Sequence, residues 1–580
     1  MKKIVLSLIA ILSASFLFSQ EALKSTEEEY YDFLSLQGIV ERPTLGYRTL
    51  SDSEWKFIEK EVDVVDEDGN PLTDEAGNKL TNLVMPDHPW QKNNLGTKRT
   101  LWQGQEGKNW FTRGFDHSLK LKIYGPEWYN SFNTAAPYGQ NDGALWQGKG
   151  YNSSLTGGAR LEAYGFEVTL KPQVSFSQNL SFSYIKPNYS GENFADKAAT
   201  YGYYGLPSID APQRFGDSAF WNYDWGDTEL RWSWNTFTTG IGTQSIWLGP
   251  AKLNPIIHSN NAPSYPKIDI GLRKTSLYMP HFDWHLGDIE LRGWWGYLSE
   301  SDYFDNNSSN NHNLITGLSL NYEFPGIFKG FSIGFNRTML SKWSNISAYS
   351  LFKIFTPGNV GSGGSDENDQ RISVTFEYLL PKIGLDLYLE WGRNDYTSDL
   401  LSILQYPFRT QGWTAGINKA FKTKNTRFEL IFEYTTLECS SDWKVSWPST
   451  FYAHHIILQG YTNRGQWLAA GIGTGGNSQY LGTNIYTKNN KINIFIQRIN
   501  PDLDYTWFID TNKTTENDPG RNIKALINLG LSITHFFTPN LNITGSYIAD
   551  LIINQENKAD PDIARRTFNN HIAISAKYNF

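Results

Sequence analysis

Two glycine-rich motifs in the sequence match enzyme patterns, but their surroundings do not fit those enzymes. Residues 330–334 read GFSIG and match G-x-S-x-G, yet a nucleophile elbow requires a strand, a strained turn and then a helix. This serine lies instead within FSIGFNR, where apolar and polar residues alternate. Residues 471–476 match G-x-G-x-x-G without the βαβ unit of a dinucleotide site. We interpret both matches as chance and expect no catalytic residues, although a Ser–His–Asn barrel hydrolase remains an alternative.

Clusters that could bind a metal are also weak. His281 and His285 are four residues apart, but the HFDWH run follows a proline and reads as a strand or loop. His454 and His455 would point to opposite sides of a strand. The repeat DEDGNPLT–DEAGNKLT at residues 66–81 resembles a calcium loop, but its first ligand position holds a valine. We therefore predict no metal site and no cofactor.

Aromatic and amide side chains occur together in three stretches, residues 141–154, 246–271 and 454–467. Tryptophan and tyrosine rings stack on the C–H faces of sugars, whereas amides, carboxylates and guanidinium groups hydrogen-bond to sugar hydroxyls. A single tryptophan or tyrosine in a membrane barrel more often belongs to the aromatic girdle at the membrane interface. The hypothesis that these stretches bind sugar therefore depends on groups of residues and not on any one ring. The candidate polysaccharide contacts are Trp247, Asn254, His258, Asn260, Asn261, Arg273, Asn141, Asp142, Trp146, Asp369 and Arg371.

Strands must position these candidates, because period-two alternation dominates the chain from residue 118 onward. RISVTFEYLL, residues 371–380, places Ile372, Val374 and Phe376 on one face and charged or hydroxyl residues on the other. Aromatic residues make up 15% of the 580 residues and the mean hydropathy is −0.46, a combination typical of a transmembrane barrel with aromatic girdles and a polar lumen. We predict an all-β fold, a transmembrane antiparallel β-barrel of about 16 to 18 strands with 18 favoured.

The N-terminal part of the chain has a different organisation. Lys2 and Lys3 precede a short apolar run, as in a cleaved signal peptide, so we expect export through the periplasm. Capping boxes at residues 25–28 and 51–54 predict two short helices. The predicted organisation is a signal peptide at residues 1–19, a periplasmic N-terminal helical element at 20–62, a linker or insert with a duplicated acidic hairpin at 63–117, and the outer-membrane barrel at 118–580.

Residues 246–271 interrupt the strand pattern with four prolines. Proline lacks the N–H group that a central strand needs, so this stretch cannot belong to the wall. It also contains Ile246, Trp247 and Leu248, which are too apolar for a solvated loop. We predict that it folds into the barrel as a loop or plug, because irregular backbone at membrane depth must be surrounded by protein or water.

Charge, cysteine content and the last strand add expectations about partners. The net charge of −8 argues against a nucleic-acid partner, and the single cysteine, Cys439, cannot form an internal disulfide. The run HIAISAKYNF alternates like a last barrel strand and ends in Phe580, as in strands that the barrel-assembly machinery reads. We expect contact with that machinery, with outer-membrane lipid and with lipopolysaccharide-type glycolipid, in the outer membrane of a Gram-negative-type bacterium.

Five stretches together resemble the Wzi family of capsule-assembly outer-membrane proteins. They are residues 30–55, 141–158, 246–268, 366–381 and 454–482, and their order along the chain is more specific than any one of them. The resemblance implies an 18-stranded barrel with a blocked lumen, a small periplasmic helical element, and lectin-like, non-catalytic holding of capsular or related surface polysaccharide. The acidic duplication and the asparagine-rich loops depart from the enterobacterial type, which leaves the identity of the glycan open.

We therefore predict an outer-membrane barrel, not an enzyme, that binds surface or capsular polysaccharide and helps to attach or organise it. Weak contacts repeated along a polymer provide useful avidity. Two alternatives remain open. One is a porin for oligosaccharides, which ion conductance would reveal, and the other is an accessory barrel of an envelope secretion or assembly complex, which co-purification would reveal.

Overall fold

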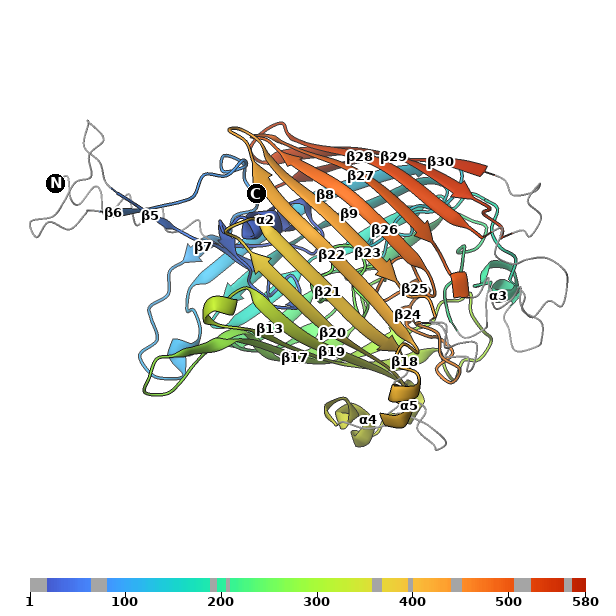
Figure 1. Cartoon of the computed structure of the whole chain (residues 1–580), viewed down its shortest axis with the longest axis horizontal. Helices are drawn as coiled ribbons and strands as arrows, with labels where there is room; N and C mark the ends of the chain where they lie inside the picture. The colour runs from blue at the N-terminus through green and yellow to red at the C-terminus, as the bar shows by residue number, and fades with distance from the viewer. Residues whose placement is uncertain are drawn as a thin grey trace, which may run out of the picture.

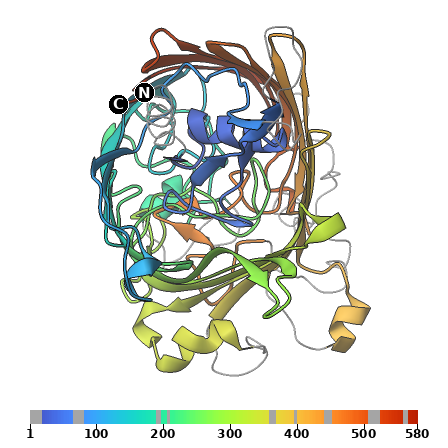
Figure 2. The ribbon, with the colours of Figure 1, turned by 90° about the vertical axis from the view of Figure 1, so that its left-hand side faces the viewer.

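Alternating side chains build the wall of a closed antiparallel barrel (Figure 1, Figure 2). The computed structural model describes residues 18–63, 81–187, 196–204, 209–356, 368–394, 400–439, 451–504, 523–557 and 566–580. In the strand β27 (Asn490–Asn500), Ile494 and Ile496 face outward and are about half exposed, whereas Gln497 faces inward and is buried. Apolar side chains therefore face lipid and polar side chains face the lumen.

The wall has 18 strands within the described residues, as predicted. In chain order they are β8 (Leu119–Asn133), β9 (Gly150–Ala163), β10 (Phe166–Leu170) with β11 (Gln173–Ser177), β12 (Phe220–Asp224) with β13 (Glu229–Trp234), β14 (Phe237–Gly242), β16 (Lys267–Tyr278), β17 (His285–Ser299), β18 (His312–Glu323), β19 (Phe331–Lys342), β20 (Asn368–Leu380), β21 (Leu385–Asn394), β22 (Gln411–Lys422), β23 (Arg427–Thr436), β26 (Asn477–Tyr486), β27, β28 (Ala525–Phe536), β29 (Leu541–Ile553) and β30 (Arg566–Tyr578). β10 and β11 form one interrupted strand, as do β12 and β13, and the short β7 (Arg99–Trp102) adds to β8. The barrel closes where β30 pairs with β8.

The two ends of the barrel differ in the length of their connections. Short turns such as residues 164–165 and 487–489 join strands at one end, whereas long connections such as residues 134–149 and 243–266 join them at the other. Barrels of this kind place their short turns in the periplasm and their long loops outside the cell. The helix α2 (Thr26–Leu36) lies inside the short-turn end, which is therefore the periplasmic end (Figure 2).

The first predicted helix is confirmed as α2. Ser25 caps it by accepting a hydrogen bond from the backbone N–H of Glu28 at 3.2 Å. Its apolar face buries Tyr30 and Phe33, and Phe33 stacks on Tyr486 of β26 with ring centroids 4.3 Å apart. These rings hold the helix across the periplasmic mouth. In the part of the chain that is described, no helix is long and apolar enough to cross a membrane.

The second predicted helix, starting at residues 51–54, is wrong. The chain there forms a strand, β4, in a three-stranded sheet. Ser51, which would have capped the helix, donates instead to Glu229 of the wall at 2.5 Å, and Asp52 accepts from Arg292 at 2.7 Å. These wall contacts override the local capping signal. The short strands of the N-terminal element are β1 (Phe18–Gln20), β2 (Val40–Glu41), β3 (Tyr47–Arg48) and β4 (Glu54–Phe57).

The proline-rich stretch folds into the lumen, as predicted. The strand β15 (Trp247–Leu248) pairs with β3, so this connection reaches from the outer mouth to the N-terminal element. Residues 451–476, with the short strands β24 (Thr462–Asn463) and β25 (Gln466–Trp467), pack against it in the same core. We call residues 243–266 and 451–476 the plug. The apolar residues of the first segment that are fully buried include Ile246, Trp247, Leu248, Ile256 and Ile257.

Three inward-facing carboxylates on the wall hold irregular backbone in place. Glu433 of β23 accepts from the backbone N–H groups of residues 252–254, at 2.6 to 3.2 Å. Glu390 of β21 accepts from Ile256 at 2.9 Å, and Glu290 of β17 accepts from residues 45–47 at 2.8 to 3.1 Å. A buried N–H group without an acceptor is costly, and a carboxylate accepts from several donors at once. The wall therefore supplies partners that these irregular segments lack.

The acidic insert is described only at its base. There β5 (Lys60–Asp63) pairs antiparallel with β6 (Thr81–Val84), and the pair extends away from the periplasmic end in Figure 1. The predicted duplicated hairpin lies almost entirely in residues 64–80, which are outside the described residues.

Arg42 provides a test of how the N-terminal element is attached. Its guanidinium pairs with Asp32 of α2 and with Asp386 of the wall, both at 3.0 Å, and with Glu377. Arg42→Ala removes the cation that pairs with Glu377 and leaves Asp386 with only Lys252, at 3.8 Å. We therefore expect the free energy of unfolding to fall by about 3–5 kcal/mol. Guanidinium unfolding of detergent-solubilised protein measures this. The exposed Arg113→Ala control should change it by less than about 0.5 kcal/mol, and equal stability of the two variants would contradict this attachment.

Candidate functional site

Two adjoining cavities lie inside the barrel between α2, the connection at residues 134–149 and the plug. The larger has a volume of about 460 Å³ and the smaller one of about 220 Å³. Lys24, Tyr129, Asn141 and Asp142 line both, so the two cavities meet at these residues. The candidate site is therefore lumenal, with the periplasmic element on one side and outer connections on the other.

Aromatic rings and amides line the larger cavity together. Asn493, Phe495 and Gln497 of β27 line it. Side chains alternate along a strand, so these three point into the lumen while the residues between them face lipid. Rings and amides in one cavity fit the C–H faces and hydroxyls of a sugar. Further rings and amides of the lining are Tyr129, Tyr138, Tyr480, Gln147 and Asn484.

None of these lining wall residues is among the predicted contacts, although the sequence contains a signal for them. The run NIFIQ at residues 493–497 alternates, and its isoleucines identify the lipid side. The remaining residues of the run must then face the lumen. Most of the predicted contacts lie instead in loop-like stretches rich in asparagine, residues 141–154 and 246–261, where alternation carries no information on which way a side chain points.

Four predicted contacts come together at the cavities. Asn141 and Asp142 line both, and Asn260 lines the smaller one. The backbone N–H of Asn141 donates to Asn261 Oδ1 at 2.9 Å, which joins the 134–149 connection to the plug. The side-chain oxygens of Asn141 and Asn260 are buried and have no hydrogen-bond partner among the described residues. Because an unpaired buried oxygen is costly, a donor such as a sugar hydroxyl would be favoured at this junction.

Trp247, Asn254 and His258 are buried within the plug and line neither cavity. His258 Nδ1 lies 3.0 Å from two backbone carbonyls, and its Nε2 lies 2.7 Å from the Tyr265 hydroxyl. Burial, helped by the nearby Lys267, lowers the pKa of His258 to about 3. The ring is therefore neutral, donates from Nδ1 and accepts at Nε2. These contacts maintain the fold of the plug, and contact of the three residues with sugar stays a prediction.

The remaining predicted contacts also lie away from the cavities. Asp369 and Arg371 are fully buried and pair with each other at 2.7 Å, and the Arg371 guanidinium lies 4.5 Å from the ring centroid of Tyr461 in the plug. Trp146 packs edge-on against Phe215, with ring centroids 5.3 Å apart. The structure gives these three residues protein partners, so a role for them in sugar binding stays a prediction.

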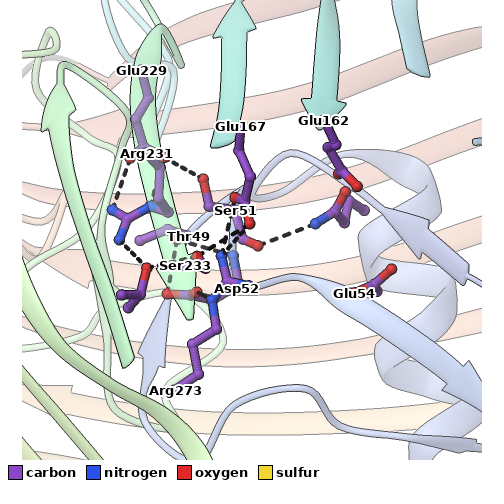
Figure 3. A network of polar contacts seen from close by, with 12 residues as sticks. Thr49, Ser51, Asp52, Glu54, Glu162, Glu167, Glu229, Arg231, Ser233 and Arg273 are labelled. Atoms are coloured by element: carbon purple, nitrogen blue, oxygen red, sulfur yellow. Dashed lines mark hydrogen bonds and ion pairs between the residues drawn. The ribbon is translucent and has the colours of Figure 1, made fainter. Parts of the chain in front are cut away.

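Arg273 belongs to the polar network of Figure 3, which joins the wall to the N-terminal element. It pairs with Asp52 at 2.9 Å and with Glu167 of β10 at 2.8 Å. In the same network, Arg231 of β13 pairs with Glu229 at 2.7 Å. Opposite charges within one wall strand and across several strands thus neutralise each other, and Asp52 ties the N-terminal element to them. Sugar contact by Arg273 stays a prediction beside this structural role.

Charged groups of α2 and the plug form the periplasmic side of the larger cavity. Lys252 Nζ lies 2.5 Å from Asp32 Oδ2. Burial alone would raise the pKa of Asp32, but Lys252, Arg42 and Arg48 hold this pKa below its ordinary value. Burial raises the pKa of Asp142 to about 7, so this carboxyl changes charge near neutral pH. Among the described residues, no three His, Cys, Asp or Glu side chains are grouped as metal ligands.

The pKa of Asp142 predicts a pH dependence of stability. Its folded-state pKa of about 7 lies above the ordinary value of 3.8, so the folded chain keeps a proton that the unfolded chain releases. Stability should therefore fall as the pH rises from about 4 to about 7 and then level off. Asp142→Asn, which keeps an oxygen to accept from Gln147, should show a smaller fall when thermal unfolding is followed over this range. Parallel pH curves for the two proteins would contradict the assignment.

Comparison with known proteins identifies the family. The chain matches a family model described as capsule assembly protein Wzi over residues 140–562. Among solved structures, it is similar to Wzi, an outer membrane protein involved in group 1 capsule assembly in Escherichia coli and described as a carbohydrate binding β-barrel. The identity is 12%, the match covers 79% of this chain and 85% of that chain, and the TM-score is 0.52.

Other outer-membrane barrels are similar at lower scores. OccAB2 of Acinetobacter baumannii is 12% identical over 78% of this chain and 97% of that chain, with a TM-score of 0.38. OprB of Pseudomonas putida is 10% identical over 78% and 94%, with a TM-score of 0.34. No curated protein matches the sequence significantly.

The family match covers the wall strands from β9 to β29 together with the first segment of the plug and its second segment. Wzi of Escherichia coli shares the fold. Family and fold place the protein in the outer membrane of a Gram-negative bacterium. The chain belongs to the Wzi family of capsule assembly proteins.

Proposed function

We propose that this barrel binds capsular or other surface polysaccharide in its lumenal cavities and helps to hold it at the cell surface, without catalysis. The observation that carries the proposal is the lining of the larger cavity, where tyrosine and phenylalanine rings face amides across one lumen. The similar Escherichia coli protein is described as a carbohydrate binding barrel, which supports the same class of ligand.

Binding of this kind works through many weak contacts and needs no cofactor. One hydroxyl bonded to an amide contributes about 0.5–1.5 kcal/mol net, so a single sugar unit binds weakly. A polymer presents the same groups repeatedly, which raises their effective concentration at the site. We propose Asn141, Asp142 and Asn260 as contacts, because they line the cavities. The apolar outer wall would contact membrane lipid and lipopolysaccharide-type glycolipid, and β30 would be read by the barrel-assembly machinery.

Loss of cell-bound polysaccharide tests the proposal. We expect a deletion strain to shed more polysaccharide than wild type, and equal retention by the two strains would contradict the function. The combined variant Tyr138→Leu and Asn141→Gly removes one ring and one amide from the cavities. Glycine suits the φ of 59° at position 141. We expect the purified variant to bind isolated polysaccharide about tenfold more weakly.

A control variant separates this effect from general damage to the barrel. Tyr547→Leu changes a half-exposed ring on the outer face of β29. It should bind polysaccharide as wild type does. A loss of binding equal to that of the cavity variant would contradict a lumenal site.

A porin for oligosaccharides is the main alternative, and planar bilayers distinguish it. With the plug in the lumen, we expect no steady large conductance from wild-type protein. Glu390→Ala combined with Glu433→Ala removes the acceptors of four plug N–H groups, so channel openings should appear. The control Glu106→Ala, at an exposed side chain, should stay closed. Steady large channels from wild-type protein would favour the porin.

A further inference from the structure

The barrel wall is incomplete at its outer end, beside the plug. β14 ends at Gly242 and β16 begins at Lys267, its direct partner, because the chain between them folds inward. β12 continues toward the outer end on one side of this break, and β17 does so on the other. Among the described strands, β12 pairs only with β11, and β17 beyond Gly296 pairs only with β18. Two strand edges therefore face the break without a partner strand.

A cavity of about 480 Å³ occupies this break. Tyr223 and Asp224 of β12 line one side, and Tyr297 and Ser299 of β17 line the other. We call this cavity the wall notch. The rest of its lining is Trp225, Thr228, Gly242, Thr243, Ser264, Tyr265, Pro266, Asn463 and Arg464.

The notch opens toward the membrane. Tyr223 and Trp225 are about half exposed, whereas Asp224 between them is buried, so the two rings lie on the lipid-facing side of the wall. β12 follows the long connection from β11, and β17 leads into another long connection. The notch therefore lies in the outer half of the barrel, at the level where aromatic rings meet the outer leaflet.

Arg464 closes the notch from the inside. It lies in the two-residue turn between β24 and β25, where Arg464 and Gly465 have φ values of 50° and 81°. Its backbone N–H donates to the carbonyl of Ser299 at 2.7 Å, and its guanidinium donates to Asn222 at 2.8 Å. One plug residue thus bridges the two strand edges. Its guanidinium also lies 3.7 Å from Asp224, which balances its charge.

The plug already bonds much of the β17 edge, since the Tyr297 N–H donates to the Pro266 carbonyl at 2.9 Å and the Ser299 N–H donates to Asn463 Oδ1 at 3.0 Å. Acyl chains cannot hydrogen-bond to what remains of the two edges. A ligand with several hydroxyls can bond there, and its sugar faces can stack on the tyrosine and tryptophan rings. The balanced pair of Arg464 and Asp224 favours neutral hydroxyls over a phosphate. A ligand that reaches the notch from the membrane side also needs an apolar part.

We infer that the wall notch binds the sugar head of an outer-leaflet glycolipid, whose acyl chains remain in the membrane beside Trp225. Asp224 and Ser264 line both the notch and the smaller lumenal cavity, so the two adjoin there, but the notch opens toward the membrane. It adds a membrane-anchored ligand to the proposed function without depending on polymer bound inside the barrel.

Site-specific photo-crosslinking tests the inference. The full-length protein carries p-benzoylphenylalanine at Tyr223 or Tyr297, in vesicles of phosphatidylcholine and diglucosyl diacylglycerol in equal amounts with matched acyl chains. Mass spectrometry then measures the ratio of crosslinked glycolipid to crosslinked phospholipid. The controls carry the crosslinker at Tyr434 or Tyr547, exposed rings elsewhere on the lipid-facing wall. We expect a ratio about tenfold higher at the notch than at the controls, and equal ratios would overturn the inference.

The same preparations distinguish this inference from the proposed function. Binding of soluble polysaccharide is measured on each crosslinker variant before irradiation. Normal polysaccharide binding with equal crosslinking ratios would overturn the notch alone. Selective crosslinking in a protein that binds no polysaccharide would support the notch and overturn the lumenal function.

Discussion

Every buried backbone N–H and carbonyl of a barrel in lipid needs a partner within the protein, and this structure depends on how that requirement is met. The wall strands meet it by pairing with one another. The plug does not, because only a few of its residues form short strands. Glu290, Glu390 and Glu433 supply acceptors from the wall instead. A buried carboxylate is itself costly without donors, so wall and inserted segments stabilise each other.

The same mutual stabilisation of the wall and the segments inside it explains what fills the periplasmic end. α2 presents aromatic rings to the wall on one face and carboxylates to lysine and arginine on the other. Asp52 reaches into the arginine network of the wall. Each of these groups would be unfavourable alone inside the barrel. Together they fill much of the mouth with paired charges and packed rings, and cavities of about 460 and 220 Å³ remain in the lumen.

One departure of the chain from the sheet has consequences on both sides of the wall. Where residues 243–266 leave the wall, they bring Asn260 and Asn261 to the connection that carries Asn141, which completes the lumenal cavities. The same departure removes the outer halves of two strands and leaves the wall notch behind. A polymer site inside the barrel and a lipid-facing site in its wall would thus share one segment.

The sequence by itself determined the barrel, the orientation of its side chains and the inward fold of the proline-rich stretch. These features follow from local signals, namely alternation at period two and the missing N–H of proline. It also located Asn141 and Asp142, which line the cavities. Only the tertiary structure decided which charges pair. Arg273 and Arg371 have the types expected of sugar contacts, yet strand register and closure place carboxylates beside them.

The region after Leu50 shows the physical reason most clearly. Its residues carry the local signal of a helix start, but Ser51 and Asp52 find wall partners 178 and 240 residues away. A capping signal is worth about 1 kcal/mol, whereas a buried charge pair that loses one member costs several times more. Local chemistry therefore determined the wall, where neighbouring residues decide the outcome, and tertiary structure decided the contents of the lumen, where the partners come together only once the barrel has closed.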